Sequence, residues 1–247
     1  MELIFLVGAL LLATLVIYLT DGDRFLAGII YGTDGSWPGI NRFPWNILYD
    51  WAPAPGIVLA VLALLVCIGS FFYQPLKKQR CPAVFLLLLL AIGPGLVVNV
   101  LLKDNLGRAR PREIIECGGS HQYTEIWRKG TTGSNSSFPS GHASIAFYTL
   151  APWFVLRDTK RKAAAGFLFF GIGFGAAVGL ARMLQGGHFL SDVLWAGGIV
   201  YLVGGILALI FPPAAGSVQM EQKTGSSGQF FKHRQHRCID LLNGYCL

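Results

Sequence analysis

Residues 83–102 read AVFLLLLLAIGPGLVVNVLL, a run that contains no charged side chain. A helix needs about 20 mostly apolar residues to cross the hydrocarbon core of a bilayer. Lipid offers no partners to free backbone N–H and C=O groups, so such a run must be helical there. This stretch therefore predicts a membrane-spanning helix.

Similar apolar runs lie on both sides of this one and predict a polytopic helix bundle. The predicted spans are Leu3–Leu19, Gly56–Tyr73, Ala83–Leu102, Ala143–Leu156, Ala163–Leu180 and Val193–Phe211. The fourth is short and contains Pro152, so we expect it to extend further or to kink. The fifth contains four glycines that suit close approach of a neighbouring helix: Gly171, Gly173, Gly175 and Gly179. The predicted fold class is all-α, a six-transmembrane helix bundle over residues 1–212 with a flexible basic cytoplasmic tail over 213–247.

The composition of the chain excludes an ordinary soluble domain. Hydrophobic residues make up 53% of the 247 residues and charged residues only 13%, whereas soluble domains carry about 25% charged residues. Disorder is excluded too, because it requires low hydrophobicity and high charge. The net charge of +7 suits anionic lipid, a phosphorylated substrate or the cytoplasmic leaflet. A nucleic-acid partner does not fit this hydropathy.

The distribution of basic residues predicts the orientation in the membrane. The loops 74–82 and 157–162 and the tail are rich in Lys and Arg, whereas the loop 20–55 has more acidic than basic residues. The positive-inside rule therefore places both termini in the cytoplasm. The loop 103–142 would then lie outside although it is basic, and we interpret its cations as substrate ligands.

The loop 20–55 contains three tryptophans, Trp37, Trp45 and Trp51. Tryptophan favours the headgroup level of a membrane. An aromatic belt is the interpretation we favour, and an interfacial, re-entrant or lid-like segment is the alternative.

The first polar cluster follows the third predicted span and contains Lys103 and Arg110. On a continuing helix these residues, seven apart, would share a face. An Arg fork beside a Lys point charge suits a phosphate. A snorkelling cluster at the membrane interface is the alternative.

The second cluster, Ser137-Phe138-Pro139-Ser140-Gly141-His142, comes directly before the fourth predicted span. A helix start of this kind can offer backbone N–H groups and a hydroxyl to an anion, and His142 would lie beside that anion. The alternative is a structural histidine at a helix entry.

The third cluster contains Arg182, His188 and Asp192, between the last two predicted spans. If the turn is helical, Asp192 lies one turn after His188 and can hold one ring nitrogen while the other stays free, as in nucleophilic catalysis. A buried structural His–Asp pair is the alternative.

All three clusters are expected at one membrane face, where ionisable residues generally have a function. His142 and His188 are too few for a closed zinc site. No cluster has enough carboxylates for a hard metal ion. We therefore expect phosphate chemistry without a metal or another cofactor.

These clusters resemble the three-part signature of the type 2 phosphatidic acid phosphatase family, K-x6-R-P, P-S-G-H and S-R-x5-H-x3-D. The matching residues are Lys103, Arg110, Pro111, Pro139, Ser140, Gly141, His142, Arg182, His188 and Asp192. Ala181 departs from the pattern, because it replaces the small hydroxyl residue before Arg182. The stretches 107–112 and 186–192 further resemble bacterial lipid A phosphatases.

The resemblance implies a role for each matching residue. His188 would be the nucleophile that forms a phosphohistidine, Asp192 would orient it, and His142 would be the general acid and then the base. The implied phosphate ligands are Lys103, Arg110, Ser140, Gly141 and Arg182. Arg108 and Arg112 are candidate headgroup contacts because of their place in the chain. The mechanism also implies that the two histidines have different pKa values.

The predicted protein is thus a metal-independent phosphoric monoester or pyrophosphate hydrolase acting on a lipid headgroup. A lipid A-type substrate is favoured, and polyprenyl diphosphate, phosphatidylglycerophosphate and phosphatidic acid stay open. A lipid-to-lipid phosphotransferase and a non-catalytic lipid-binding or transport protein are the alternatives. The expected location is the bacterial inner (plasma) membrane, with the site on the periplasmic face. The expected partners are the lipid phosphate and the bilayer, without nucleic acid or an obligate protein partner.

Overall fold

The computed structural model describes residues 1–133 and 135–213, and within them it contains helices and loops but no β-strand. The predicted tail therefore lies almost wholly outside the described residues. The elements are α1 (Glu2–Leu19), α2 (Gly22–Tyr31), α3 (Trp45–Asp50), α4 (Ala54–Phe72), η1 (Gln74–Gln79), α5 (Arg80–Leu90), η2 (Ala91–Lys103), α6 (Asp104–Leu106), η3 (Pro111–Glu113), η4 (Ile115–Cys117), α7 (Gly141–Phe147), η5 (Tyr148–Leu150), α8 (Pro152–Leu156), α9 (Arg161–Leu184) and α10 (Leu190–Ile210).

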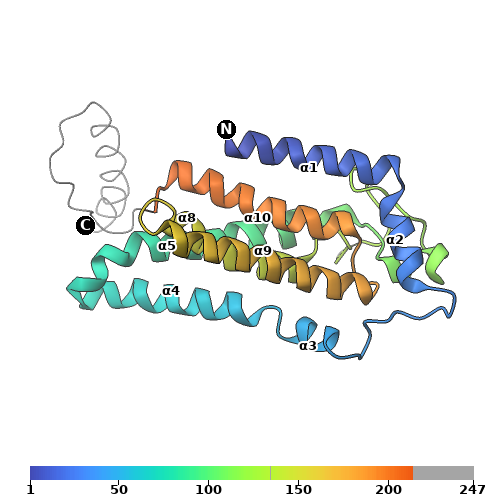
Figure 1. Cartoon of the computed structure of the whole chain (residues 1–247), viewed down its shortest axis with the longest axis horizontal. Coiled ribbons are helices and arrows are strands. Elements are labelled where there is room, and N and C mark those ends of the chain that lie inside the picture. Colours follow the sequence, from blue (N-terminus) through green and yellow to red (C-terminus); the bar gives the residue numbers. More distant parts are fainter. Residues whose placement is uncertain (134, 214–247) are drawn as a thin grey trace.

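Five helical stretches in the described part of the chain are long and apolar enough to cross a membrane. They are Glu2–Leu19, Trp45–Phe72, Gln74–Glu113, Arg161–Leu184 and Leu190–Ile210. Figure 1 shows these long helices running side by side. The all-helical prediction is therefore confirmed for the described residues, and five of the six predicted spans match these stretches.

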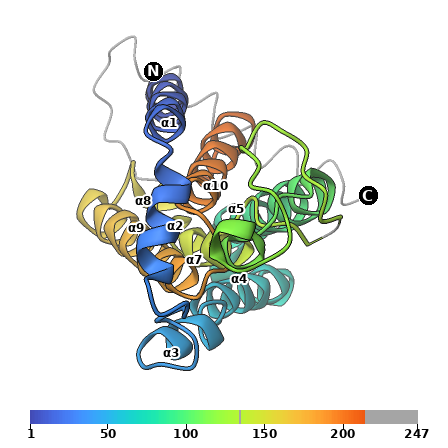
Figure 2. The ribbon, with the colours of Figure 1, turned by 90° about the vertical axis from the view of Figure 1, so that its right-hand side faces the viewer.

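The fourth predicted span, Ala143–Leu156, folds as the three short pieces α7, η5 and α8. Pro152 stands at the first position of α8, where its missing N–H breaks the helical hydrogen-bond pattern. Figure 2 shows α7 in the middle of the bundle, between α4, α5, α9 and α10. The segment α7–η5–α8 is therefore a buried core element, in which Tyr148 and Ala151 have no exposed surface.

Helix α9 approaches this core element closely through glycines spaced four apart. A Cβ atom on Gly171 would lie 2.4 Å from the Leu150 backbone nitrogen, and one on Gly175 would lie 2.2 Å from the Phe147 ring. A Cβ on Gly179 would lie 2.2 Å from the Val193 side chain on α10. Gly173 has no neighbour within 4 Å of such a Cβ, so the prediction of close packing was wrong for this residue.

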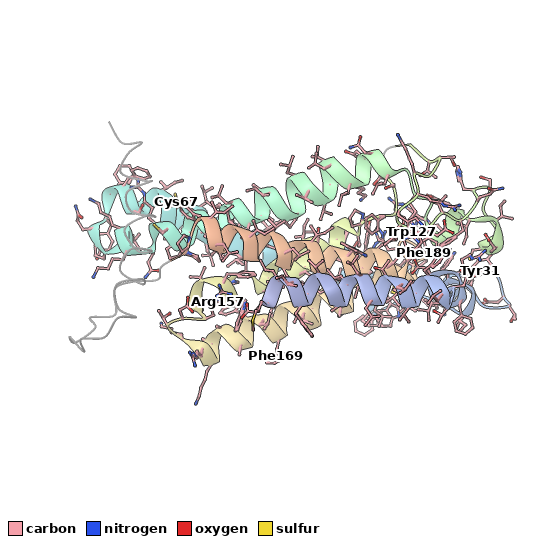
Figure 3. All side chains as sticks on the ribbon, turned by 90° about the horizontal axis from the view of Figure 1, so that it is seen from above. Tyr31, Cys67, Trp127, Arg157, Phe169 and Phe189 are labelled. Atoms are coloured by element: carbon pink, nitrogen blue, oxygen red, sulfur yellow. The ribbon has the colours of Figure 1, made fainter. Side chains whose placement is uncertain are left out.

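The two ends of the bundle differ in chemistry. Glu2 at the start of α1 pairs with Arg157 after α8 across 3.5 Å, so the α1 start, the α8–α9 turn and the α4–α5 turn share one end (Figure 1). Elements α2 and α3 and the loop 107–140 form the other end. Figure 3 places Tyr31, Trp127 and Phe189 at that second end, far from Cys67 and Arg157.

Candidate active site

The three predicted motifs meet at the end of the bundle that carries α2 and α3. Lys103 is the last residue of η2, His142 lies in the first turn of α7, and Arg182 lies in the last turn of α9. His188 and Asp192 flank the start of α10. The candidate active site is thus built from the ends of four separate elements.

His188 is held in one tautomer by a backbone carbonyl. Its side chain is 2% exposed, and its Nδ1 lies 2.7 Å from the carbonyl oxygen of Ser137. A carbonyl can only accept a hydrogen bond, so Nδ1 carries the proton and donates it. The other ring nitrogen, Nε2, therefore keeps its lone pair, which a nucleophile requires.

Asp192 lies beside His188 but does not hold it in the way the sequence suggested. The start of α10 lies after His188, so the two residues do not share a helical turn, and Asp192 Oδ2 is 3.6 Å from His188 Nδ1. Asp192 Oδ2 instead accepts from the Ser137 hydroxyl at 2.5 Å and from the Phe189 N–H at 2.8 Å. The Asp192 carboxylate thus fixes the backbone segment whose carbonyl orients the histidine.

Arg182, Lys103 and Arg110 are close enough to one another and to His142 to interact electrostatically. Arg182 is 5% exposed and donates to the Gln185 side chain at 2.6 Å, while its Nε has no hydrogen-bond partner in the described part of the chain. Arg110 donates from Nη2 to the Asn135 side chain at 3.1 Å. These three cations form a site that suits a multiply charged anion.

Lys103 and Arg110 reach this place without sharing a helix, contrary to the sequence prediction. Gly107, with φ +62°, ends the helix in the left-handed conformation, which glycine adopts without steric cost. Pro111 disfavours helix at the residue before it, and Arg110 is extended. The turn between them folds Arg110 back toward Lys103.

Ser140 and Gly141 begin α7 in the manner of an N-cap and first helical residue. The Ser140 hydroxyl accepts from the Ala143 N–H at 3.4 Å. A Cβ on Gly141 would lie 2.8 Å from Asn99 Oδ1 and 3.5 Å from Lys103 Nζ. The absent side chain lets the α7 backbone approach the Lys103 ammonium.

His142 is half-buried and stacks on Tyr49 of α3, with ring centroids 4.7 Å apart and planes inclined by 29°. The Arg182 guanidinium lies 4.6 Å from the centre of the same Tyr49 ring. Burial, and then the charges of Arg182, Lys103 and Arg110, lower the pKa of His142 to about 4. Tyr49 therefore contacts both the candidate acid and one of the candidate phosphate ligands.

The pKa values of the two histidines are lowered alike, whereas the mechanism implied a difference. Burial lowers the pKa of His188 to about 4, although its neighbour Asp192 favours the protonated form. Burial also lowers the pKa of His142 to about 4, and the three cations contribute because they repel its proton. A difference between the two requires an anion that neutralises those cations.

Arg108 does not contact a headgroup, and this expectation was wrong. Its side chain is 1% exposed and makes salt bridges of 2.5 Å to Asp192 and 2.7 Å to Asp23. A buried guanidinium needs such partners, because an unpaired charge is costly away from water. Arg112, in contrast, is exposed, and its N–H donates to the Gly186 carbonyl at 3.1 Å.

The tryptophan-rich loop packs against the third motif. The Gly39 N–H donates to the Leu184 carbonyl at 2.9 Å. A Cβ on Gly186, whose φ is +62°, would lie 2.5 Å from the Trp37 ring. The loop therefore forms one wall of the candidate site, while Trp51 is 67% exposed.

Sequence reasoning placed Ser137 in the second cluster without giving it a role, and it missed Tyr49 and Asp23 as site residues. Ser137 is the first residue of that cluster, two positions before Pro139, so its position was a usable signal. Tyr49 and Asp23 lie in the loop 20–55, where nothing in the sequence sets them apart. The described part of the chain holds no group of three or more His, Cys, Asp or Glu side chains with the spacing of a metal site.

Comparison with known proteins agrees with this geometry. The model of the PAP2 superfamily matches residues 82–215, more than half of the 247 residues. The chain therefore belongs to the PAP2 superfamily.

Two individual proteins of known name are similar in sequence to this chain. A lipid A 4'-phosphatase of Francisella tularensis subsp. novicida (strain U112) is 36% identical over 148 residues, which cover 59% of this chain and 66% of that protein. A lipid A 4'-phosphatase of Rhizobium leguminosarum is 35% identical over 127 residues, covering 49% and 51%. The chain thus spans less than two thirds of the length of these relatives.

A solved structure has the same fold. It is the crystal structure of a transmembrane PAP2-type phosphatidylglycerolphosphate phosphatase from Bacillus subtilis, with a TM-score of 0.54 over 83% of this chain and 93% of that chain. At 21% sequence identity, this likeness concerns the fold alone.

Proposed function

We propose that this protein is an integral membrane lipid phosphatase that removes a phosphate group from a lipid headgroup through a phosphohistidine on His188. One observation carries the proposal. The Ser137 carbonyl fixes the proton on His188 Nδ1, which leaves Nε2 unprotonated at a site that also holds Arg182, Arg110 and Lys103.

In the first step, His188 Nε2 attacks phosphorus and the bond from phosphorus to the leaving lipid oxygen breaks. Protonated His142 gives its proton to that oxygen. Lys103, Arg110 and Arg182 hold the phosphoryl oxygens, together with Ser140 and the Gly141 N–H. Phosphoryl transfer depends mainly on positioning and on stabilisation of charge, which a cluster of cations supplies.

In the second step, water attacks the phosphohistidine while neutral His142 accepts a proton from it. The N–P bond breaks, inorganic phosphate leaves, and His188 returns to its neutral form. The Ser137 carbonyl holds the ring through Nδ1 throughout, and Asp192 holds Ser137 in place. Arg112 is exposed beside Arg110 and Arg182 and would contact the rest of the headgroup.

The favoured substrate is a lipid A-type phosphate ester, because two of the relatives are named lipid A 4'-phosphatases. Polyprenyl diphosphate, phosphatidylglycerophosphate and phosphatidic acid offer the same phosphate at the interface. We assign the site to the periplasmic face of the inner membrane and both ends of domain 1–212 to the cytoplasm. The Lys and Arg residues at the opposite end of the bundle support this orientation.

Phosphate release from detergent-purified protein tests the proposal. The wild type should release phosphate from at least one of these four lipids in the presence of a chelator. His188→Gln and His142→Gln should each lower turnover by at least about a thousandfold, as losses of catalytic groups do. His121→Gln is the matched control, since His121 lies at the same end but outside the cation cluster, and it should keep wild-type turnover.

The reaction products distinguish a phosphatase from a phosphotransferase and from a protein that only binds lipid. Adding an unphosphorylated acceptor lipid identifies a phosphotransferase if the phosphate moves to that lipid instead of to water. Lipid binding without release of phosphate from any of the four lipids would contradict the proposal.

A further inference from the structure

Asp23 is a buried carboxylate close to the nucleophile that the proposed chemistry does not use. It lies in the first turn of α2 and is 2% exposed. Its Oδ1 accepts from the Ser191 N–H at 3.0 Å, and its Oδ2 accepts from the Ser191 hydroxyl at 2.5 Å. Oδ2 also accepts from Arg108 Nη2 at 2.7 Å. Both oxygens of Asp23 therefore hold Ser191, and Oδ2 also holds Arg108, which in turn contacts Asp192.

Arg108 joins Asp23 to the carboxylate beside His188. Its Nη1 donates to Asp192 Oδ1 at 2.5 Å and to the Ser191 hydroxyl at 2.8 Å, and its Nε donates to the Thr124 carbonyl at 2.8 Å. A guanidinium fork held at all three nitrogens has one orientation. Asp23 thus determines how Arg108 meets Asp192, and Asp192 in turn fixes the segment that orients His188.

Tyr123 closes this network on its outer side. Its hydroxyl lies 3.2 Å from Arg108 Nη2 and 3.5 Å from Asp23 Oδ2. Burial raises the pKa of Tyr123 to about 12. The phenol therefore stays neutral at pH 7 and adds no charge to the network.

The charges of this network favour a cationic His188. Asp23 and Asp192 bring two negative charges and Arg108 one positive charge, which leaves one net negative charge among buried groups. When Nε2 carries the phosphoryl group and Nδ1 keeps its proton, the His188 ring is positively charged. A fixed negative charge in a water-poor site stabilises that state.

We propose that Asp23 is a positioning residue for the nucleophile His188, acting through Arg108 and Asp192, and that its negative charge stabilises the phosphohistidine. This inference rests on the proposed function, because it concerns the same intermediate. It assigns to the short helix α2, outside the three motifs, a part in catalysis.

Asp23→Asn tests the proposal, with Asp21→Asn as the matched control. Asp21 lies two residues earlier, is half exposed and pairs only with the exposed Arg24 among the described residues. Asp23→Asn should lower kcat by roughly 10- to 100-fold. KM should stay within about twofold of the wild type, because Asp23 does not reach the phosphate ligands. Asp21→Asn should leave both constants unchanged.

The pH profile distinguishes this role from a merely structural one. The charged groups that face His188 are Asp192, Arg182 and Arg110, with Arg108 and Asp23 behind Asp192. Loss of one negative charge disfavours protonated His188, so the acid limb of kcat/KM should move to lower pH in Asp23→Asn. Asp21→Asn should keep the wild-type limb.

Two measurements check that each variant is folded: its thermal unfolding and its binding of orthovanadate, a phosphate-like anion. If Asp23→Asn does not fold, Ser191→Ala replaces it, since it removes the hydroxyl between Asp23 and Arg108 and should lower kcat several-fold at unchanged KM. A wild type inactive on all four lipids would overturn the proposed function itself. If the wild type is active and folded Asp23→Asn has the same kcat and pH profile as Asp21→Asn, this inference alone is overturned. An Asp23→Asn protein that differs from the wild type only by a higher KM would overturn it as well.

Discussion

At the scale of single residues, the protonation of His142 depends on what fills the site. Its pKa is lowered to about 4 by burial and by the charges of Arg182, Lys103 and Arg110, so it is neutral at pH 7 when the site is empty. A general acid must be protonated. A phosphate dianion among the three cations would cancel their repulsion of that proton. The substrate itself would therefore bring His142 into its acidic form.

We expect bound anion to raise the pKa of His142 by at least one unit. The measurement is an NMR titration of histidine-labelled protein with and without saturating orthovanadate. By linkage, the anion should also bind more tightly as the pH falls through the raised pKa. The His142→Gln protein identifies the resonance that belongs to His142. An unchanged His142 titration at saturation would contradict the proposed role of the three cations.

The candidate site shows what single residues in a sequence can and cannot reveal. Lys103, His142, Arg182 and His188 stand in fixed spacings with a chemical meaning, and the structure brings them together. Arg108 was misassigned because its neighbours in sequence, Lys103 and Arg110, contact the site, whereas its partners Asp23 and Asp192 lie far away in the chain. No local pattern reports which buried carboxylate an arginine will meet.

At the scale of elements, α9 depends on glycines only where a neighbour is close. Gly171 and Gly175 meet the core element α7–η5, and Gly179 meets α10, whereas Gly173 faces open space. Composition alone could not show which of these glycines pack against a neighbour, because all lie in one apolar run. That depends on which side of α9 faces the core.

We expect Gly175→Ala to destabilise the protein by about 1–3 kcal/mol, the usual cost of overpacking. The added Cβ would lie 2.2 Å from the Phe147 ring, so that ring must move. Gly173→Ala is the control on the same helix and should be neutral or slightly stabilising, since alanine is the better helix former. Equilibrium unfolding in detergent measures both variants. Equal stabilities would show that α9 and α7 do not pack this closely.

The fourth predicted span, Ala143–Leu156, shows that hydropathy does not distinguish a buried core segment from a lipid-facing helix. Its apolar residues serve the centre of the bundle and not a lipid-facing surface, so α7, η5 and α8 need not be long. A buried core segment and a short span have the same composition. Pro152 indicated the break, but the location at the centre required the packing of the other helices.

At the scale of the whole molecule, the charges at the two ends predict the orientation in the membrane. A membrane-impermeant maleimide should label Lys129→Cys in intact bacterial cells, because Lys129 is exposed at the end that carries the candidate site. Lys78→Cys is exposed at the opposite end and should react only after the cells are permeabilised. The unsubstituted protein gives the background from native cysteines. The reverse pattern of labelling would place the site in the cytoplasm.

The distance in sequence between Asp23 and its partners bears on how the protein is made. Ser191 and Asp192, which complete the network behind His188, are synthesised long after α1 and α2 have left the ribosome. The contacts of Asp23 with Ser191 can therefore form only after the first turn of α10 has been made. A nascent chain that stops before α10 contains His188 but lacks Ser191 and Asp192, which belong to the network behind it. The proposed hydrolysis would therefore require a chain that includes the first turn of α10, since Asp192 lies there.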